Sequence, residues 1–119
     1  MPVSGMDDHV EVRASPVLPV SDLDRALAHY AALGFRTSRH DDTYGFAAWA
    51  GLELHLSVDP SATGVEVFLH VPDADAVATA WAGTGTTAPT DQPWRVREGS
   101  HVDPDGNLVR FGSPLASGA

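Results

Sequence analysis

The sequence contains no cysteine among its 119 residues. It therefore forms no disulfide bonds, and thiolate metal ligands and cysteine nucleophiles are excluded from any site that it holds. Long hydrophobic runs are also missing, because no stretch approaches the roughly 18 apolar residues of a membrane-spanning helix. The first eight residues do not have the pattern of a signal peptide. We expect a cytoplasmic protein that does not act at a membrane.

Basic residues are scarce, because 7 Lys and Arg stand against 16 Asp and Glu, for a formal net charge of −9 at pH 7. So acidic a surface repels phosphate, and we expect no nucleic-acid partner. It favours a cationic ligand, although many proteins carry such charge only for solubility. The hydrophobic content of 43% and mean hydropathy of −0.10 are typical of a globular chain, and the length predicts one domain over residues 1–119.

A strand-helix unit occurs twice in the chain, at a constant offset of 51 residues. In each copy an aspartate is placed to cap the start of the helix, and a glycine follows its end. Agreement at the start, the aromatic position and the end of a helix indicates an internal repeat. The matched pairs are Val20 and Val71, Asp22 and Asp73, Tyr30 and Trp81, and Gly34 and Gly85.

The pattern around each helix predicts a β-α-β-β-β order in both halves, with module 1 at about 11–58 and module 2 at about 65–112. Pro16 and Pro19 cannot donate to a sheet ladder, so the first strand is expected at an edge, bent, or crossing between sheets. The predicted strands are 11–20, 35–39, 44–49, 52–57, 65–71, 84–90, 96–102 and 107–111, and the predicted second helix is 73–82.

Strand 52–57 alternates cleanly, with its three leucines on one face and Glu53, His55 and Ser57 on the other. A sheet that carries one helix leaves one face open. Two such modules are expected to form a curved sheet with a concave cup, and a concave surface of this kind suits a ligand. The sequence therefore predicts an α+β fold with a binding cup.

Stretches 15–22, 33–35, 51–56, 92–94 and 103–111 together resemble the vicinal oxygen chelate superfamily, and within it the bleomycin-resistance proteins. The last stretch, Asp-Pro-Asp-Gly-Asn-Leu-Val-Arg-Phe, is fairly specific for the superfamily, and the Gln-Pro-Trp loop at 92–94 favours its drug-binding branch. The resemblance implies a homodimer with two ligand clefts at its interface. It also implies that the first strand is often exchanged between subunits, with Pro16 at the crossing. Closure within one chain remains the alternative.

Enzymes of this superfamily take one metal ligand from each of four strands. The internal repeat places Ser15, His55, Glu66 and Arg110 at these positions. A guanidinium has no lone pair to offer and repels a dication by several kcal/mol, so Arg110 is expected to pair with Glu66 instead. We predict no catalytic metal and no cofactor, with a weak site at His55 and Glu66 as the alternative.

Aromatic side chains are the candidate lining residues of the binding cup, because a flat drug would stack on their rings. Tyr30, Phe35 and Trp81 are expected in the core, and three of the six histidines, His9, His29 and His40, at the surface. Asp41 and Asp42 would either attract a cationic tail or form a solvated turn. The predicted ligand-binding residues are Tyr44, Phe46, Trp49, His55, Glu66, Phe68, Trp94 and Arg110.

The leading hypothesis is a protein that sequesters a flat, often cationic antibiotic in a dimer cleft, without catalysis. One alternative is an enzyme of the glyoxalase or dioxygenase type, metal-dependent or metal-free, that acts on a small oxygenated metabolite. A metal-free enzyme would use His55 as its general base. Another is a partner-binding or purely structural dimer whose own side chains fill the cup. Fold alone does not choose among ligands.

Overall fold

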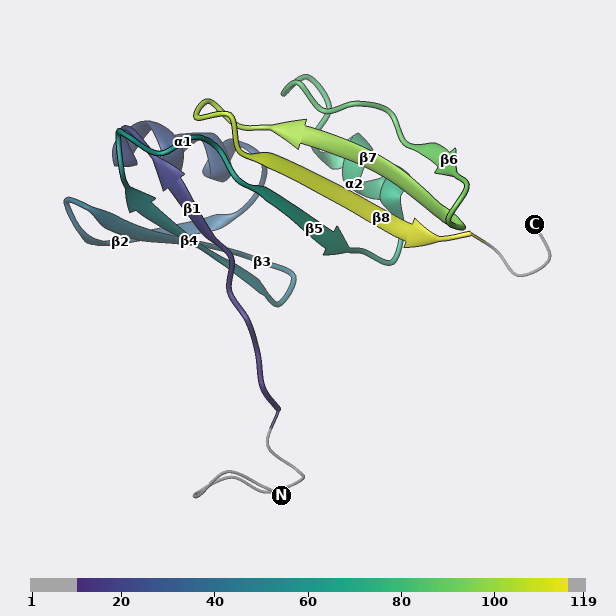
Figure 1. Ribbon diagram of the computed structural model, residues 1–119, viewed down its shortest axis with the longest axis horizontal. Helices are drawn as coiled ribbons and strands as arrows, with labels where there is room; N and C mark the ends of the chain where they lie inside the picture. Colours follow the sequence, from purple (N-terminus) through teal and green to yellow (C-terminus); the bar gives the residue numbers. More distant parts are fainter. Residues whose placement is uncertain (1–10, 116–119) are drawn as a thin grey trace.

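A computed structural model describes residues 11–115 and contains two helices and eight strands over that range (Figure 1). No helix within it is long and apolar enough to span a membrane. The elements are β1 (Val17–Val20), α1 (Leu23–Ala32), β2 (Arg36–Asp41), β3 (Tyr44–Trp49), β4 (Leu52–Val58), β5 (Glu66–His70), α2 (Ala74–Ala80), β6 (Thr90–Gln92), β7 (Val96–Val102) and β8 (Leu108–Pro114).

The strands form two four-stranded sheets of the same plan, ordered β1-β4-β3-β2 and β5-β8-β7-β6. The first strand of each half runs parallel to the last, and the other pairs are antiparallel. Val17 lies opposite His55 in one sheet, and Phe68, which follows Val17 by 51 residues, lies opposite Arg110 in the other. The predicted pair of β-α-β-β-β units is confirmed.

Both helices begin and end where local chemistry requires. Asp22 accepts a hydrogen bond from the backbone N–H of Arg25 at 3.0 Å, and Asp73 does the same from Ala76 at 3.2 Å. Each bond satisfies an N–H that has no partner inside the helix. Gly34 follows α1 with φ of 104°, a conformation that glycine adopts without steric penalty.

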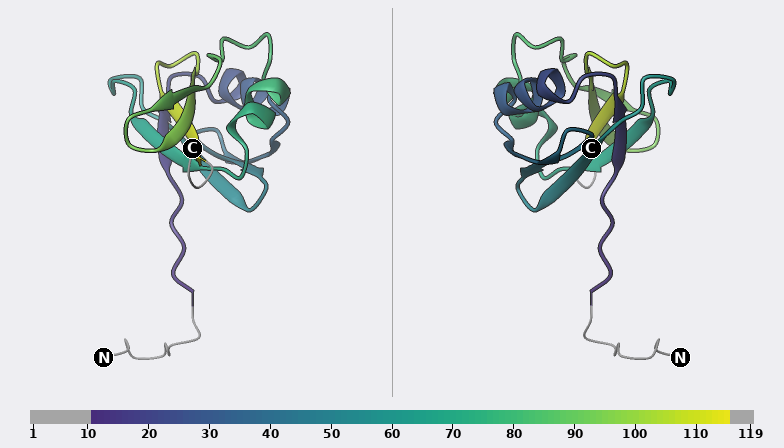
Figure 2. Two further views of the ribbon diagram at one scale, coloured as in Figure 1. Left: turned by 90° about the vertical axis from the view of Figure 1, so that its right-hand side faces the viewer. Right: turned by 90° about the vertical axis from the view of Figure 1, so that its left-hand side faces the viewer.

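Two predicted strands differ from the structure. β1 begins at Val17, and residues 11–16 form an exposed N-terminal arm that leads away from the body (Figures 1 and 2). The described chain offers this arm no partner strand, and Pro16 has no N–H for a ladder. The strand predicted at 84–90 is instead a loop with a single bridge at Thr86, because Gly85 turns at a φ of 85°, and β6 follows at Thr90.

One aromatic cluster joins the two halves. Trp81, which follows α2, packs against Trp49 and Phe35 of the first half at ring-centroid distances of 5.6 and 6.1 Å. It also contacts Phe111 of β8 at 5.4 Å, and Tyr30 reaches Phe35 at 5.4 Å. Tyr30, Phe35 and Trp81 are buried, as predicted, and the two halves share a single core.

A buried hydrogen-bond network at 103–107 makes a second connection between the halves. The hydroxyl of Tyr30 donates to Asp103 at 2.8 Å, and the amide of Asn107 donates to the carbonyl oxygen of Pro19 at 2.9 Å. Asn107 also accepts from the backbone N–H of Val65 at 2.9 Å. Burial and the adjacent Asp103 carboxylate raise the pKa of Tyr30 far above its ordinary value, so the phenol stays protonated and donates.

The sequence predicts His29 at the surface, but in the structure its side chain is half-buried. Its Nε2 lies 2.7 Å from Nε2 of His101, which is 0% exposed and has its Nδ1 2.9 Å from the hydroxyl of Thr86. Burial lowers the pKa of both imidazoles, and that of His101 falls to about 4. These lowered pKa values leave both rings neutral at neutral pH, so one Nε2 carries a hydrogen and donates it to the other. His40 is exposed as predicted, and His9 lies outside the described residues.

We expect Tyr30→Phe to reduce the free energy of unfolding by about 1–3 kcal/mol, because it removes a hydrogen bond from the buried carboxylate of Asp103. Chemical denaturation monitored by circular dichroism measures this loss. Tyr44→Phe is the matched control, since its hydroxyl lies at the edge of an open sheet face, and it should cost less than about 1 kcal/mol. Equal losses in the two variants would contradict a connecting role for Tyr30.

Acid should destabilise the protein through the buried imidazole of His101. Because its pKa is about 4 when folded and 6.5 ordinarily, the unfolded chain binds a proton that the folded chain excludes between these values. Stability is therefore complete above pH 6.5 and falls as the pH decreases, by about 1–2 kcal/mol between pH 7 and pH 5. Urea denaturation at both pH values should show a smaller loss in His101→Gln than in the native protein, and an unchanged loss in His40→Gln. An identical pH dependence in His101→Gln would refute this assignment.

Candidate functional site

Each sheet has one face that packs against a helix and one face that no helix of the described chain covers. Helix α1 lies against the side of β3 on which Gly45 sits, since a Cβ there would meet Leu23 and Leu27 at 3.2 Å. Tyr44 and Phe46 therefore project from the opposite side. We call this uncovered surface, with Tyr44, Phe46, Glu53 and His55, the first face.

Three side chains on the first face form a hydrogen-bonded chain. The hydroxyl of Tyr44 lies 2.7 Å from Nδ1 of His55, and Nε2 of His55 lies 3.0 Å from a carboxylate oxygen of Glu53. The ring of Phe46 meets His55 edge-on at 5.0 Å and Tyr44 at 5.7 Å. Both nitrogens of His55 are thus occupied by protein groups, and the imidazole has no lone pair free for another partner.

The second face is the uncovered side of the other sheet and carries Glu66, Phe68, Glu98 and Arg110. The guanidinium of Arg110 binds both carboxylate oxygens of Glu98, at 2.7 and 3.0 Å, and reaches Glu66 at 3.5 Å. It also lies 5.2 Å from the ring centre of Phe68, at a distance typical of cation-π contacts. The hydrogen bonds from Arg110 lower the pKa of Glu98, and the same carboxylate raises that of Arg110.

Glu98 is the residue of this face that sequence reasoning missed. The alternation of 96–102 places Glu98 on one side of its strand, but only the pairing register shows that this side is shared with Arg110. In that register Ser100 lies opposite Arg110 and Glu98 lies diagonally, opposite Gly112. The predicted Glu66 contact is present, but it is the longer of the two.

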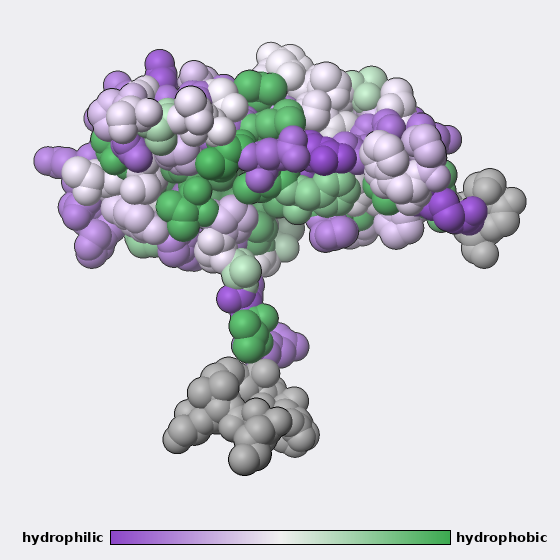
Figure 3. Space-filling model, in the orientation of Figure 1, coloured by the Kyte–Doolittle hydropathy of each residue, from purple (hydrophilic) through white to green (hydrophobic). Residues whose placement is uncertain are grey.

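Trp94 lies in the turn between β6 and β7 and is 56% exposed. It lines a groove of about 650 Å³ together with Phe68, Val96 and Pro114. Figure 3 shows apolar surface gathered along the middle of the molecule, beside a band of hydrophilic residues. An exposed indole beside an apolar groove is suited to contact a flat ring.

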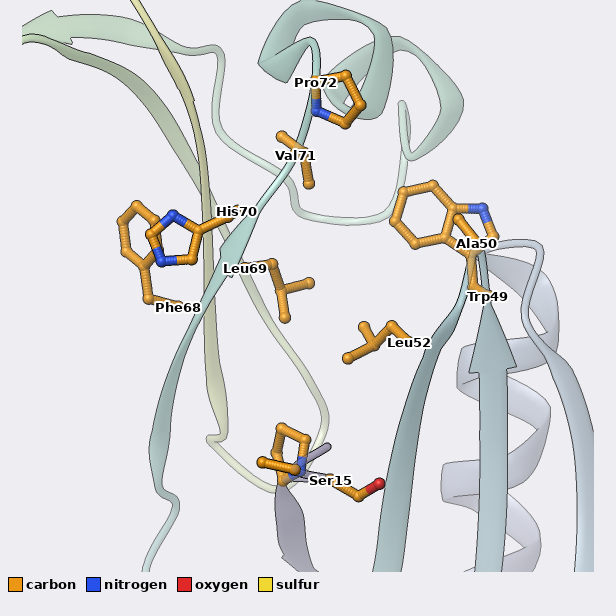
Figure 4. A pocket seen from close by; sticks show the side chains of 11 residues that line it. Ser15, Trp49, Ala50, Leu52, Phe68, Leu69, His70, Val71 and Pro72 are labelled. Atoms are coloured by element: carbon orange, nitrogen blue, oxygen red, sulfur yellow. The ribbon is translucent and has the colours of Figure 1, made fainter. Parts of the chain in front are cut away.

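Trp49 lies apart from both faces. It lines a groove of about 580 Å³ between the two halves, where the N-terminal arm leaves the body. Figure 4 shows Leu52 and Leu69 directed into this groove, with Phe68 and His70 on the far side of β5. The eight predicted ligand-binding residues are therefore found in three places within one chain, with Tyr44, Phe46 and His55 on the first face, Glu66, Phe68, Trp94 and Arg110 on or beside the second, and Trp49 between the halves.

The four positions Ser15, His55, Glu66 and Arg110 are divided between the arm and the two sheets. Ser15 lies in the arm before β1, and no hydrogen bond or ion pair among the described residues joins His55 to Glu66 or Arg110. Over residues 11–115 no three His, Asp or Glu side chains cluster as metal ligands. The donor set does not fit a divalent ion, because His55 has both nitrogens engaged and Arg110 is a cation.

No protein-family model matches the sequence, and no curated protein is similar to it. Solved structures do match. A bleomycin resistance determinant encoded on the transposon Tn5 superposes with a TM-score of 0.79 at 24% identity, over 89% of this chain and 100% of that one. The chain has the fold of the bleomycin-resistance proteins.

Two further structures show the range of this fold. The bleomycin-binding protein from Streptomyces verticillus, complexed with copper(II)-bleomycin, matches at 25% identity and a TM-score of 0.71, over 87% of this chain and 97% of that one. A lactoylglutathione lyase from Agrobacterium tumefaciens matches at 17% identity and the same TM-score, over 87% and 94% of the two chains. The fold expected from the resemblance is confirmed, and the matching structures include both a bleomycin-binding protein and a lactoylglutathione lyase.

Protein purified without a histidine tag should contain well below one divalent metal ion per chain by elemental analysis. Any weak binding seen when Zn²⁺ is titrated should survive His55→Ala and decrease in His40→Ala, whose imidazole is exposed beside Asp41. A stoichiometric ion that is lost in His55→Ala would contradict the site described above.

Proposed function

We propose that this protein binds a flat, cationic antibiotic without chemical change and so lowers the concentration of the free drug. The observation that carries the proposal is the placement of aromatic rings on two uncovered sheet faces. Tyr44 and Phe46 are half-buried on the first face, and Phe68 and Trp94 border the second. Flat rings stack or pack edge-on against such side chains, with about 1 kcal/mol gained per contact beyond simple burial.

The charges on the two faces favour a cation. On the second face two carboxylates, Glu66 and Glu98, share the single guanidinium of Arg110, which leaves one negative charge in excess. On the first face Glu53 contacts His55 and Arg36 lines the same hollow, so the excess negative charge lies on the second face. With the net charge of −9, this distribution attracts a positively charged ligand and repels an anionic one.

We further propose that two copies associate, so that the first face of one and the second face of the other form a cleft. A single sheet face offers a shallow surface, and two facing sheets would enclose most of a drug-sized ligand. The N-terminal arm supports this arrangement, since Val12 is 83% exposed and, within residues 11–115, one side-chain hydrogen bond joins the arm to the body, from Arg13 to the carbonyl of Gly51. In the dimer this arm would lie on the partner copy, with Pro16 at the crossing.

The enzyme alternative is not favoured at His55. A general base needs a free nitrogen within reach of the proton that it removes. The two nitrogens of His55 are occupied by Tyr44 and Glu53, and Arg110 stands at the position where a metal-dependent relative would need an electron-pair donor.

Copper-free bleomycin should quench the tryptophan fluorescence of the protein in a saturable titration. Trp94→Ala should weaken binding at least tenfold, because truncating a buried aromatic contact in an interface often costs about 2 kcal/mol. Thr79→Ala is the control, since Thr79 is exposed on α2, on the covered side of the same sheet, and it should leave the affinity unchanged. No saturable response to bleomycin, mitomycin or a quinoline-type peptide antibiotic would refute drug sequestration.

A further inference from the structure

The hydrogen-bonded chain on the first face has a definite direction. Its outer member is the carboxylate of Glu53, which is 50% exposed and accepts hydrogen bonds but donates none. The nitrogen that faces it, Nε2 of His55 at 3.0 Å, must therefore carry the hydrogen. A neutral imidazole has only one N–H, so the other nitrogen, Nδ1, is left as an acceptor.

This tautomer fixes the hydroxyl of Tyr44. Nδ1 of His55 lies 2.7 Å from that oxygen, and an acceptor nitrogen at this distance requires the phenolic hydrogen to point at it. A phenol has one hydrogen to donate. With that hydrogen committed to His55, the Tyr44 oxygen can only accept from any further partner.

Neighbouring groups hold the chain in place. Phe46 packs edge-on against both His55 and Tyr44, and in the strand register Phe46 lies opposite His55 while Tyr44 lies opposite Ser57. Arg36 and Glu53 line the same hollow of about 320 Å³, but no ion pair between them occurs among the described side chains. The carboxylate of Glu53 is thus left to the imidazole.

We infer that Tyr44 selects ligands that donate a hydrogen bond, namely a protonated amine or amidine carried beside a flat ring. The inference rests on the proposed function and adds the chemical group that the first face recognises. The ring would contact Phe46 and Tyr44, and the N–H of the cation would point at the Tyr44 oxygen. Glu53 and His55 are positioning residues for Tyr44, because they set the direction of that hydroxyl. A ligand with a carboxylate at the same place would meet an oxygen lone pair and be rejected.

The tautomer itself can be measured without a ligand. Nitrogen-15 NMR of the histidine side chains in mildly alkaline buffer should show the hydrogen of His55 on Nε2 and none on Nδ1. Spectra of His55→Gln identify the signals, and His40→Gln is the control that should leave them unchanged. Glu53→Leu should shift His55 towards a mixture of tautomers, and Glu53→Gln, which restores an acceptor oxygen, should reduce that shift. A hydrogen on Nδ1 of His55 in the native protein would overturn the inference.

Two probes with the same ring and opposite charge test the selectivity. Tryptamine carries an ammonium and indole-3-propionate a carboxylate, and we expect the protein to bind tryptamine more tightly by calorimetry or NMR titration. Tyr44→Phe should lower the affinity for tryptamine about tenfold, since a hydrogen bond to a charged group is lost, and leave that for indole-3-propionate within twofold. Because Tyr44→Phe retains Glu53, its effect does not arise from loss of the carboxylate charge.

The outcomes separate this inference from the proposed function. If bleomycin binds the native protein but Tyr44→Phe changes neither bleomycin nor tryptamine affinity, sequestration stands and the role of Tyr44 is refuted. If neither bleomycin nor either indole probe binds at all, both are refuted. Preferential loss of tryptamine binding in Tyr44→Phe, with the native tautomer as stated, supports the inference.

Discussion

The contact between Trp81 and the aromatic side chains of the other half is the interaction on which the structure depends. Each half has a single helix, which covers one face of a four-stranded sheet and leaves too little apolar surface for an independent core. Trp81 packs against Phe35 and Trp49 on one side and Phe111 on the other. Its indole N–H is buried without a hydrogen-bond partner among the described residues, at a cost of about 1–3 kcal/mol. Burial of a tryptophan stabilises by about 3–5 kcal/mol and outweighs that cost.

The shared core determines where binding surfaces remain. Because the helix-bearing sides of both sheets turn towards the same core, their other faces stay open, and the polar and aromatic residues of the alternating strands lie there. Arg110 then decides the chemistry of the second face. Arg110 occupies the position equivalent to His55, where ion pairs with Glu98 and Glu66 neutralise its charge and fix its side chain. A guanidinium held in this way cannot bind a metal ion, but it can line a ligand-binding surface.

Much of this arrangement was predictable from local pattern. The offset of 51 residues indicated two similar halves, the aspartates at 22 and 73 marked both helix starts, and the period of two in 52–57 placed His55 opposite the buried leucines. These signals are short-range, since capping, turns and alternation depend on residues a few positions apart. The predictions were wrong where the structure of a residue depends on a partner far away in the sequence. The arm at 11–16 belongs to no strand of the described chain, and His29 is half-buried because α1 meets His101 of β7, 72 positions later.

The sequence by itself determined the fold class, the repeat and the core aromatics, because residue type and spacing suffice for each. Only the tertiary structure decided which polar groups meet. It paired Arg110 with Glu98, linked Tyr44 to Glu53 through His55, and placed Trp49 between the halves, away from the first face. These partners depend on strand register and on the packing of one half against the other, which set distances of a few ångströms between residues that no local pattern connects.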